Sequence, residues 1–266
     1  MRFILLLLSF LSLSVVQAPA DDSADIVTGH LRPGWRLADG THMAALHLRL
    51  APGWKTYWRA PGDAGIPPVF DWRSTRNLRS VSVLWPTPIV FHQSGLRSVG
   101  YKDEVILPLR IELADPTRDA RLRAIVDIGV CEDVCVPMRL RVSADLPATG
   151  GRLDGAIAAA LADQPISAED AGIGPVRCRI APLDDGMRLI AQIPVPQNMP
   201  AMEAVIETAD PYVWVAEPAI ARDAGTITAT TDLIHVDGGP FALDRSGLRF
   251  TLLGRDQTVD IRGCTG

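Results

Sequence analysis

The chain has 266 residues, of which 47 % are hydrophobic and 21 % charged, so a wholly disordered chain is excluded. The formal net charge is −5 and there is no basic run, which argues against nucleic acid as the main partner. Twenty-one prolines and 22 glycines exclude a helical bundle and favour a chain that turns often, as β-sandwiches do. The length predicts about two domains.

The N-terminal segment has the features of a secretory signal peptide. Residues 3–16 form an apolar run broken only by serines, and Ala18 and Ala20 supply small residues at the −3 and −1 positions of a cleavage site. The run is shorter than the roughly 20 residues that a membrane-spanning helix needs. We therefore predict that residues 1–20 are removed and that the protein works outside the cytoplasm, where cysteine pairs form disulfides by default.

Short β-rich segments separated by Pro/Gly turns fill most of the remaining chain. Residues 21–146 read as one β-sandwich, residues 147–165 as a linker with an Ala-rich helix over 153–162, and residues 166–266 as a second β-sandwich. The expected fold class is all-β. The expected strands are 42–50, 81–85, 105–113, 122–130 and 136–144 in the first unit, and 176–180, 187–193, 204–207, 212–215, 226–230 and 248–253 in the second.

Four cysteines can form two pairs with separate roles. The pairing we expect is Cys131–Cys135 and Cys178–Cys264, and the other two connectivities would tie the two units together across the linker. A Cys178–Cys264 disulfide would close a loop of about 85 residues and stabilise the second unit by roughly 4–5 kcal/mol. Its predicted role is structural, and the alternative is that Cys264, close to the end of the sequence, is an exchangeable thiol.

The Cys131–Cys135 pair has a different character. It encloses only three residues, so a disulfide here removes little entropy from the unfolded chain. The flanking runs predict a disulfide across a tight β-turn, and strained, exposed disulfides are the labile or catalytic ones. Glu132 and Asp133 oppose thiolate formation, which suits a pair that a partner's thiolate attacks. We predict a redox-active pair; the alternative is a structural clip.

A metal site is a competing interpretation of the same cysteines. Two thiols followed by Met138 are soft ligands that suit Cu(I). Zinc needs three or four ligands and only two cluster here, so zinc is less favoured, and we expect no cofactor. The histidines that could add a nitrogen ligand to copper are His30, His42, His47 and His92.

Four stretches in the first unit carry a resemblance to a known family. They are residues 53–68, the Trp85-Pro86 pair, residues 100–109 with the sequence GYKDEVILPL, and residues 131–137. In this order they resemble the N-terminal periplasmic domain of the thiol:disulfide interchange protein DsbD. The likeness is greater to the ScsB variety, the copper-sensitivity-suppressor relative with an extended N-terminal region, whose extension the second unit resembles in general character.

This resemblance implies an immunoglobulin-like sandwich with Cys131 and Cys135 as the redox pair on adjacent strands. Cys135 would form the mixed disulfides. A cap loop over residues 89–99 would shield the disulfide until a partner docks. Phe91 is the expected shielding ring and a core aromatic is its alternative role; the cap-loop candidates are Phe91, His92 and Tyr101. The spacing departs from the longer gap of the DsbD domain, so the geometry of the pair can differ.

The resemblance also implies partners. The family domain takes electrons from a membrane-embedded domain and passes them to periplasmic thioredoxin-like proteins. Because this sequence ends at Gly266 without such a membrane domain, we expect a membrane electron donor in trans and a thioredoxin-like or peroxiredoxin-like acceptor. A link to copper tolerance or cytochrome c maturation would follow from the family. A non-catalytic interaction module with an inert disulfide is the third hypothesis.

Two further groups of residues are expected to have structural roles. Trp54, Tyr57 and Trp58 predict a core strand followed by a rigid turn, with a partner-docking surface as the alternative. Asp103 and Glu104 are expected to be exposed acids at a strand end, with proton shuttling as the alternative.

Overall fold

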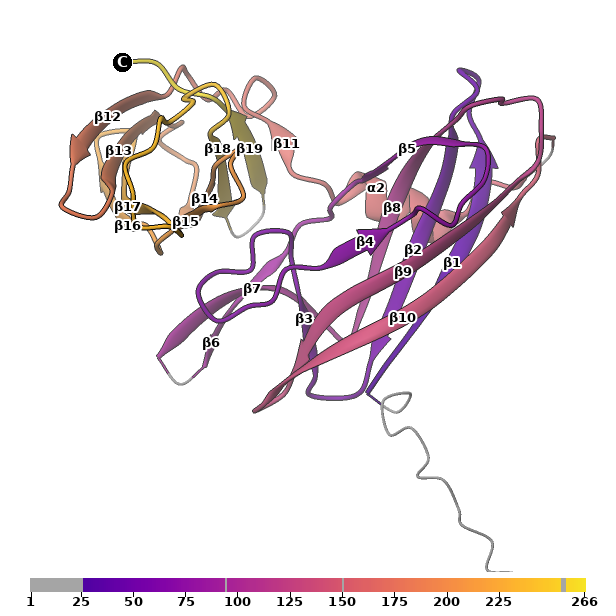
Figure 1. Ribbon diagram of the computed structural model, residues 1–266. Coiled ribbons are helices and arrows are strands. Elements are labelled where there is room, and N and C mark those ends of the chain that lie inside the picture. The colour runs from indigo at the N-terminus through magenta and orange to yellow at the C-terminus, as the bar shows by residue number, and fades with distance from the viewer. Residues whose placement is uncertain (1–25, 94, 150, 255–256) are drawn as a thin grey trace, which may run out of the picture.

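The computed structural model describes residues 26–93, 95–149, 151–254 and 257–266, and the expected signal peptide lies outside these residues. The described residues form two β-sandwich domains with one short helix between them in the chain (Figure 1). The predicted all-β class is confirmed. None of the helices in the described ranges is both long enough and apolar enough to cross a lipid bilayer.

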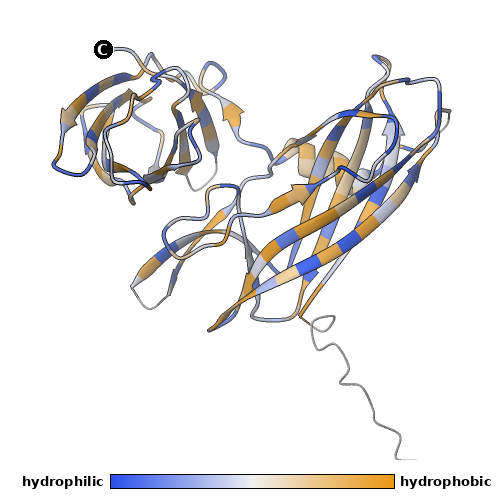
Figure 2. Ribbon diagram, in the orientation of Figure 1, coloured by the Kyte–Doolittle hydropathy of each residue, from blue (hydrophilic) through white to orange (hydrophobic). Residues whose placement is uncertain are grey.

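The first domain consists of two antiparallel sheets packed around one core. The first sheet has the strand order β1 (Val27–Arg36), β2 (His42–Leu50), β8 (Glu104–Leu113) and β5 (Leu78–Val83). The second has the order β10 (Cys135–Leu146), β9 (Ala120–Cys131), β3 (Lys55–Tyr57), β7 (Leu96–Lys102) and β6 (Ile89–Gln93), and β4 (Val69–Asp71) also pairs with β9. Apolar and polar residues alternate along β9 and β10 (Figure 2), which places one face of each strand in the core.

The second domain repeats this design with different strands. One sheet has the order β11 (Ile166–Ser167), β19 (Thr258–Arg262), β18 (Arg249–Gly254) and β14 (Ala201–Glu207). The other has the order β12 (Arg177–Pro182), β13 (Met187–Pro194), β17 (Thr226–His235) and β15 (Val213–Val215), with β16 (Ala219–Asp223) also on β17. A disulfide between Cys178 on β12 and Cys264 after β19 joins the beginning of this domain to its end.

The helix that follows the first domain, α2 (Gly155–Ala162), packs on that domain. Asp154 caps its N-terminus by accepting hydrogen bonds from the backbone N–H groups of Ala156 and Ile157. The same carboxylate receives two hydrogen bonds from Arg32 on β1, at 2.8 and 3.0 Å, and these hydrogen bonds lower the pKa of Asp154. Ile157 is fully buried in a small cluster with Met43 and Ala45. The helix therefore begins two residues later than the apolar run alone predicts.

The sequence analysis missed strands that are short or contain Gly and Pro. The clearest correction concerns the segment 89–99, expected to form a loop: residues 89–93 belong instead to β6 and residues 96–99 to β7, which pair as antiparallel strands. The other missed strands are β1, β4, β11, β16 and β19, whereas β3 falls in the core strand expected around Trp54, Tyr57 and Trp58. Gly and Pro weaken the alternating pattern in β1, and strands of two or three residues are too short to produce one.

Replacing both Cys178 and Cys264 by serine tests the structural role of that disulfide. We expect the second domain to lose roughly 4–5 kcal/mol of unfolding free energy, because the long loop regains its entropy in the unfolded chain. Urea unfolding followed by circular dichroism measures the loss. The matched control, Cys131→Ser with Cys135→Ser, opens a loop of three residues and is expected to change stability much less. Equal losses in the two variants would contradict the entropic role.

Candidate functional site

The Cys131–Cys135 disulfide lies at the tip of the β9–β10 hairpin. Cys131 is the last residue of β9, Cys135 is the first of β10, and the two are direct register partners with their Cα atoms 4.2 Å apart. Cys131 is buried, with 2 % of its surface exposed, whereas Cys135 is exposed. A nucleophile that approaches from solvent therefore meets Cys135 first.

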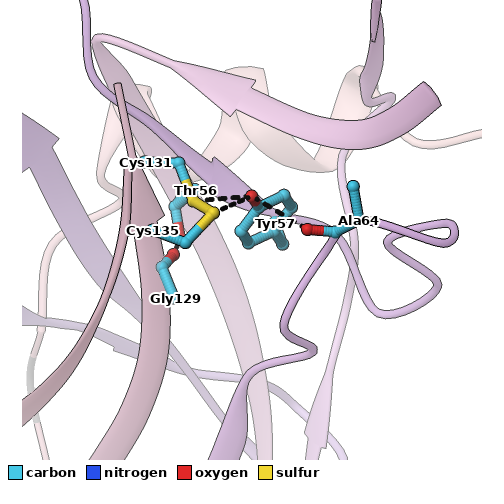
Figure 3. Close-up of a disulfide and its surroundings, with 6 residues drawn as sticks. All are labelled: Thr56, Tyr57, Ala64, Gly129, Cys131 and Cys135. Atoms are coloured by element: carbon cyan, nitrogen blue, oxygen red, sulfur yellow. Dashed lines mark hydrogen bonds between the residues drawn. A yellow bond between two sulfur atoms is a disulfide. The ribbon is translucent and has the colours of Figure 1, made fainter. Parts of the chain in front are cut away.

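Tyr57, the last residue of β3, contacts both sulfurs. Its hydroxyl oxygen is 2.6 Å from Cys131 Sγ and 3.1 Å from Cys135 Sγ (Figure 3). The sulfurs of a disulfide carry no hydrogen, so the tyrosine hydroxyl is the donor. Burial raises the pKa of Tyr57, so the hydroxyl keeps its proton at neutral pH. Tyr57 is buried on a strand, as the sequence analysis expected, but its contact with the disulfide was not anticipated.

A glycine leaves room for the tyrosine ring. Gly129 lies two residues before Cys131 on β9, and a Cβ atom there would come within 3.1 Å of the ring of Tyr57 and within 2.7 Å of the side chain of Ile66. Thr56, beside the tyrosine, donates its hydroxyl hydrogen to the carbonyl of Gly129 at 2.9 Å. The close approach of β3 to β9 thus depends on the missing side chain.

A cavity of about 130 Å³ opens beside the disulfide and contains charges of both signs. Its charged side chains are Lys55, Glu132 and Asp133. Lys55 is 8 % exposed, and burial together with the neighbouring Lys102 lowers its pKa, while Asp133 acts in the opposite direction. From the sequence, only the two acidic residues are expected to act on the cysteines. The buried lysine adds a cation to the same cavity, and a cation favours a thiolate.

The β6–β7 hairpin supplies one wall of this cavity. Leu96 and Ser98 on β7 line it. Phe91, expected as the shielding ring, is buried, and its ring centre lies 5.6 Å from the amine of Lys55 and 5.1 Å from that of Lys102. The structure therefore places Leu96, and not Phe91, in the wall of the disulfide cavity, and Phe91 covers the lysines instead.

The other two cap-loop candidates lie away from the disulfide cavity. His92 is exposed on β6. Tyr101 is buried in the core of the first domain and donates a hydrogen bond of 2.8 Å to the carbonyl of Pro86. Alternate residues of a strand face opposite sides, so Tyr101 points away from the side that Leu96 and Ser98 share.

The proposed Cu(I) ligands are not brought together. Met138 is buried in the core, and strand alternation places it on the face of β10 opposite to Cys135. His42 and His47 are buried on β2, in the other sheet, and His30 lies against His47. Among the described residues, no three His, Cys, Asp or Glu side chains are grouped as metal ligands.

Asp103 lies between β7 and β8, and Glu104 is the first residue of β8. Asp103 has a positive φ of 60°, and one carboxylate oxygen of Glu104 lies 2.6 Å from Nε2 of His47. Neither residue lines the disulfide cavity, so the carboxylates close to the sulfurs are Glu132 and Asp133.

Exposed apolar side chains lie on the β9–β10 hairpin and on the segments beside it. Val134, between the cysteines, is 71 % exposed and Leu96 is 55 % exposed. Ile66 and Val69 are also exposed and line a second shallow cavity with Pro137, two residues after Cys135. We call Ile66, Val69, Leu96, Val134 and Pro137 the apolar rim.

Fold and site define a two-domain β-sandwich protein with an accessible hairpin-tip disulfide in its first domain. Residues 30–147 match the family described as thiol:disulfide interchange protein DsbD, N-terminal. The chain is also similar to the crystal structure of the N-terminal periplasmic domain of ScsB from Proteus mirabilis, with a TM-score of 0.65 and 22 % identity, covering 90 % of this chain and 92 % of that chain. No curated sequence matches the chain. The first domain is DsbD N-terminal-like and the two-domain arrangement is ScsB-like, which confirms the resemblance.

Replacing Tyr57 by phenylalanine tests the hydrogen bond to the disulfide. Reduction converts one sulfur into a leaving thiolate, and a hydroxyl donor stabilises that anion. We therefore expect reduction of Cys131–Cys135 by dithiothreitol to slow by about tenfold, the value of a hydrogen bond to a charged group. Stopped-flow kinetics with mass-spectrometric quenching measures this rate. The control is Tyr101→Phe, which removes a buried hydroxyl bonded to Pro86. Equal rates for Tyr57→Phe and the unmodified protein would show that the contact has no chemical role.

Proposed function

We propose that this chain is a periplasmic thiol:disulfide interchange protein that carries two electrons through Cys131 and Cys135. The observation that carries the proposal is the asymmetry of the pair: the exposed residue Cys135 is joined to the buried residue Cys131, whose sulfur has a hydroxyl donor at 2.6 Å. The DsbD N-terminal match and the structural similarity to a periplasmic domain support the reaction class and the compartment.

In the reductive half-reaction, a thiolate of the electron donor attacks Sγ of Cys135. The Cys131–Cys135 bond breaks, and Cys131 leaves as a thiolate that accepts the hydrogen bond of Tyr57 and then a proton. The donor's second thiolate attacks its own sulfur in the mixed disulfide and releases Cys135. The donor's two thiols have then become a disulfide, and the pair has gained two electrons and two protons.

In the oxidative half-reaction, the same atoms act in reverse. The Cys135 thiolate attacks the disulfide of an acceptor protein and forms a mixed disulfide. Cys131 then attacks Sγ of Cys135, restores the intramolecular disulfide and releases the acceptor as a dithiol. The register pairing of the two cysteines keeps the attacking sulfur beside its target, which favours this intramolecular step.

The apolar rim indicates how a partner approaches. It includes Val134, between the two cysteines, and Leu96, in the wall of the disulfide cavity, and exposed apolar side chains near a reactive group are typical of a transient docking site. We propose a thioredoxin-like or peroxiredoxin-like acceptor and a membrane-embedded donor in trans. The links to copper tolerance and to cytochrome c maturation belong to the same proposal.

A redox titration of the purified protein tests whether the pair is a carrier. In glutathione and dithiothreitol buffers, Cys131–Cys135 should be reduced between about −150 and −250 mV, and Cys178–Cys264 should resist reduction until below about −300 mV. Mass spectrometry of alkylated peptides follows each pair separately. If both disulfides resist below about −300 mV, the electron-carrier function is wrong and an inert interaction module takes its place.

Single cysteine variants identify the attacking sulfur. Cys131→Ser leaves the exposed Cys135, which should accumulate a mixed disulfide with thioredoxin that carries an activated single cysteine. Cys135→Ser leaves the buried Cys131 and should form at least about tenfold less adduct, since access governs thiol exchange. Non-reducing gel electrophoresis measures both. Equal adduct formation would contradict the assignment of Cys135, and tight Cu(I) binding that either variant abolishes would favour the copper hypothesis.

A further inference from the structure

Strand β14 of the second domain presents one of its two faces to the first domain. Ala204 and Ile206 point into the core of the second domain. Val205, on the opposite face, packs in the core of the first domain together with Leu253 from the neighbouring β18. Glu203 and Glu207 share the face of Val205, because alternate residues of a strand point to the same side.

Two arginines of the first domain bind these two glutamates. Arg59 makes a two-pronged ion pair with Glu207, at 3.0 and 2.9 Å, and also lies 3.3 Å from the hydroxyl of Thr251 on β18. Arg97 contacts Glu203 at 3.1 Å and donates to the carbonyl of Ala204, also at 3.1 Å. The Arg97 side chain is only 5 % exposed, so water screens this ion pair weakly.

Both arginines lie within two residues in sequence of side chains that line the disulfide cavity. Arg97 lies on β7 between Leu96 and Ser98, which line the cavity, and its own side chain points to the opposite side of the strand. Arg59 follows Tyr57, the hydroxyl donor, by two residues. Each wall of the disulfide cavity is therefore attached to β14 through the backbone next to it.

The two walls are also joined to each other. The N–H of Trp58 donates to the carbonyl of Val99 at 3.0 Å, and the N–H of Val99 donates to the carbonyl of Pro61 at 2.8 Å. Gly100 permits this approach, because a Cβ atom there would lie 2.0 Å from the carbonyl oxygen of Thr56. The segment after Tyr57 and strand β7 consequently form one unit, which the second domain holds at two points.

A cavity of about 470 Å³ lies beside the two ion pairs, between residues 59–67 of the first domain and β14 and β15 of the second. It is bordered by Trp214 and Glu217. Strand β7 is held within the first domain by its pairing with β3 and β6, and on the side of the second domain by the two ion pairs and the apolar contact of Val205 and Leu253.

We propose that the second domain braces the disulfide cavity, with Arg59 and Arg97 as positioning residues that act through Tyr57 and through Leu96. Glu207 binds Arg59, and Glu203 binds Arg97. Arg59 thereby fixes the end of β3, and Arg97 fixes strand β7. These two elements keep the cavity wall in place beside the sulfurs. The inference concerns how accessible the disulfide is. It requires no protein partner, so its test is independent of the proposed electron transfer.

The test compares Glu203→Ala with Asp232→Ala in the full chain. Glu203→Ala removes the nearer of the two carboxylates beside Arg97, since Glu217 lies farther away at 3.8 Å, and should allow β7 to move away from the sulfurs. Reduction of Cys131–Cys135 by dithiothreitol should become about three- to tenfold faster, in line with the net contribution of one ordinary hydrogen bond. Amide hydrogen exchange should also rise in residues 89–102 and stay unchanged in β9 and β10. Glu203→Gln retains an acceptor oxygen and should recover most of the original rate.

Asp232→Ala is the matched control because it breaks a two-pronged ion pair with Arg188, at 2.7 and 2.9 Å, within the other sheet of the same domain. It should leave the rate and the exchange of residues 89–102 unchanged. The reduction rate of Cys178–Cys264 in each variant reports on the integrity of the second domain. The brace is overturned if Glu203→Ala changes neither the rate nor the exchange, or if Asp232→Ala changes both equally.

Discussion

The cross-strand pairing of Cys131 with Cys135 is the constraint on which the rest of the site depends. The β9–β10 hairpin continues in regular register from this pair to Ala120 and Leu146, so a long two-stranded ribbon fixes the position of the two sulfurs. Because the pair ends the ribbon, one cysteine closes the core and the other faces solvent. A disulfide in the middle of the same strands would have two equivalent, shielded sulfurs and no preferred direction of attack.

The residues around the disulfide add to this difference between Cys131 and Cys135. Tyr57 keeps its proton because burial raises its pKa, and it donates toward the sulfurs, where a thiolate must form during exchange. Lys55 places a buried cation in the same cavity as the carboxylates of Glu132 and Asp133. In the proposed function, the apolar rim is the surface that a partner covers. Together these features favour exchange at Cys135 over exchange at Cys178–Cys264, where Cys178 is buried and the disulfide joins the two ends of a domain.

Strand β14 of the second domain also depends on its contact with the first domain. This edge strand would leave unpaired backbone groups exposed, and such edges invite uncontrolled pairing. The first domain covers this strand. Arg97 donates a hydrogen bond to the carbonyl of Ala204, and Val205 packs in the core of the first domain. Arg97, which makes this contact with the edge strand, lies on β7, the strand that lines the disulfide cavity. Stability and access to the redox sulfurs are thus set by one interface.

The sequence by itself determined the all-β class, the positions of the longer strands, the helix, and the two cysteines that make up the hairpin tip, because hydrophobic alternation and turn residues are local signals. It did not place β6 and β7, where a loop was expected, and so Phe91 was the expected shielding ring, whereas Leu96 is the residue of this hairpin that lines the disulfide cavity together with Ser98. Tyr57, Lys55 and Arg97 were equally out of reach. Their roles arise from contacts between residues far apart in the chain, 74 residues for Tyr57 with Cys131 and 106 for Arg97 with Glu203, and only the packing of sheets and domains decides such contacts.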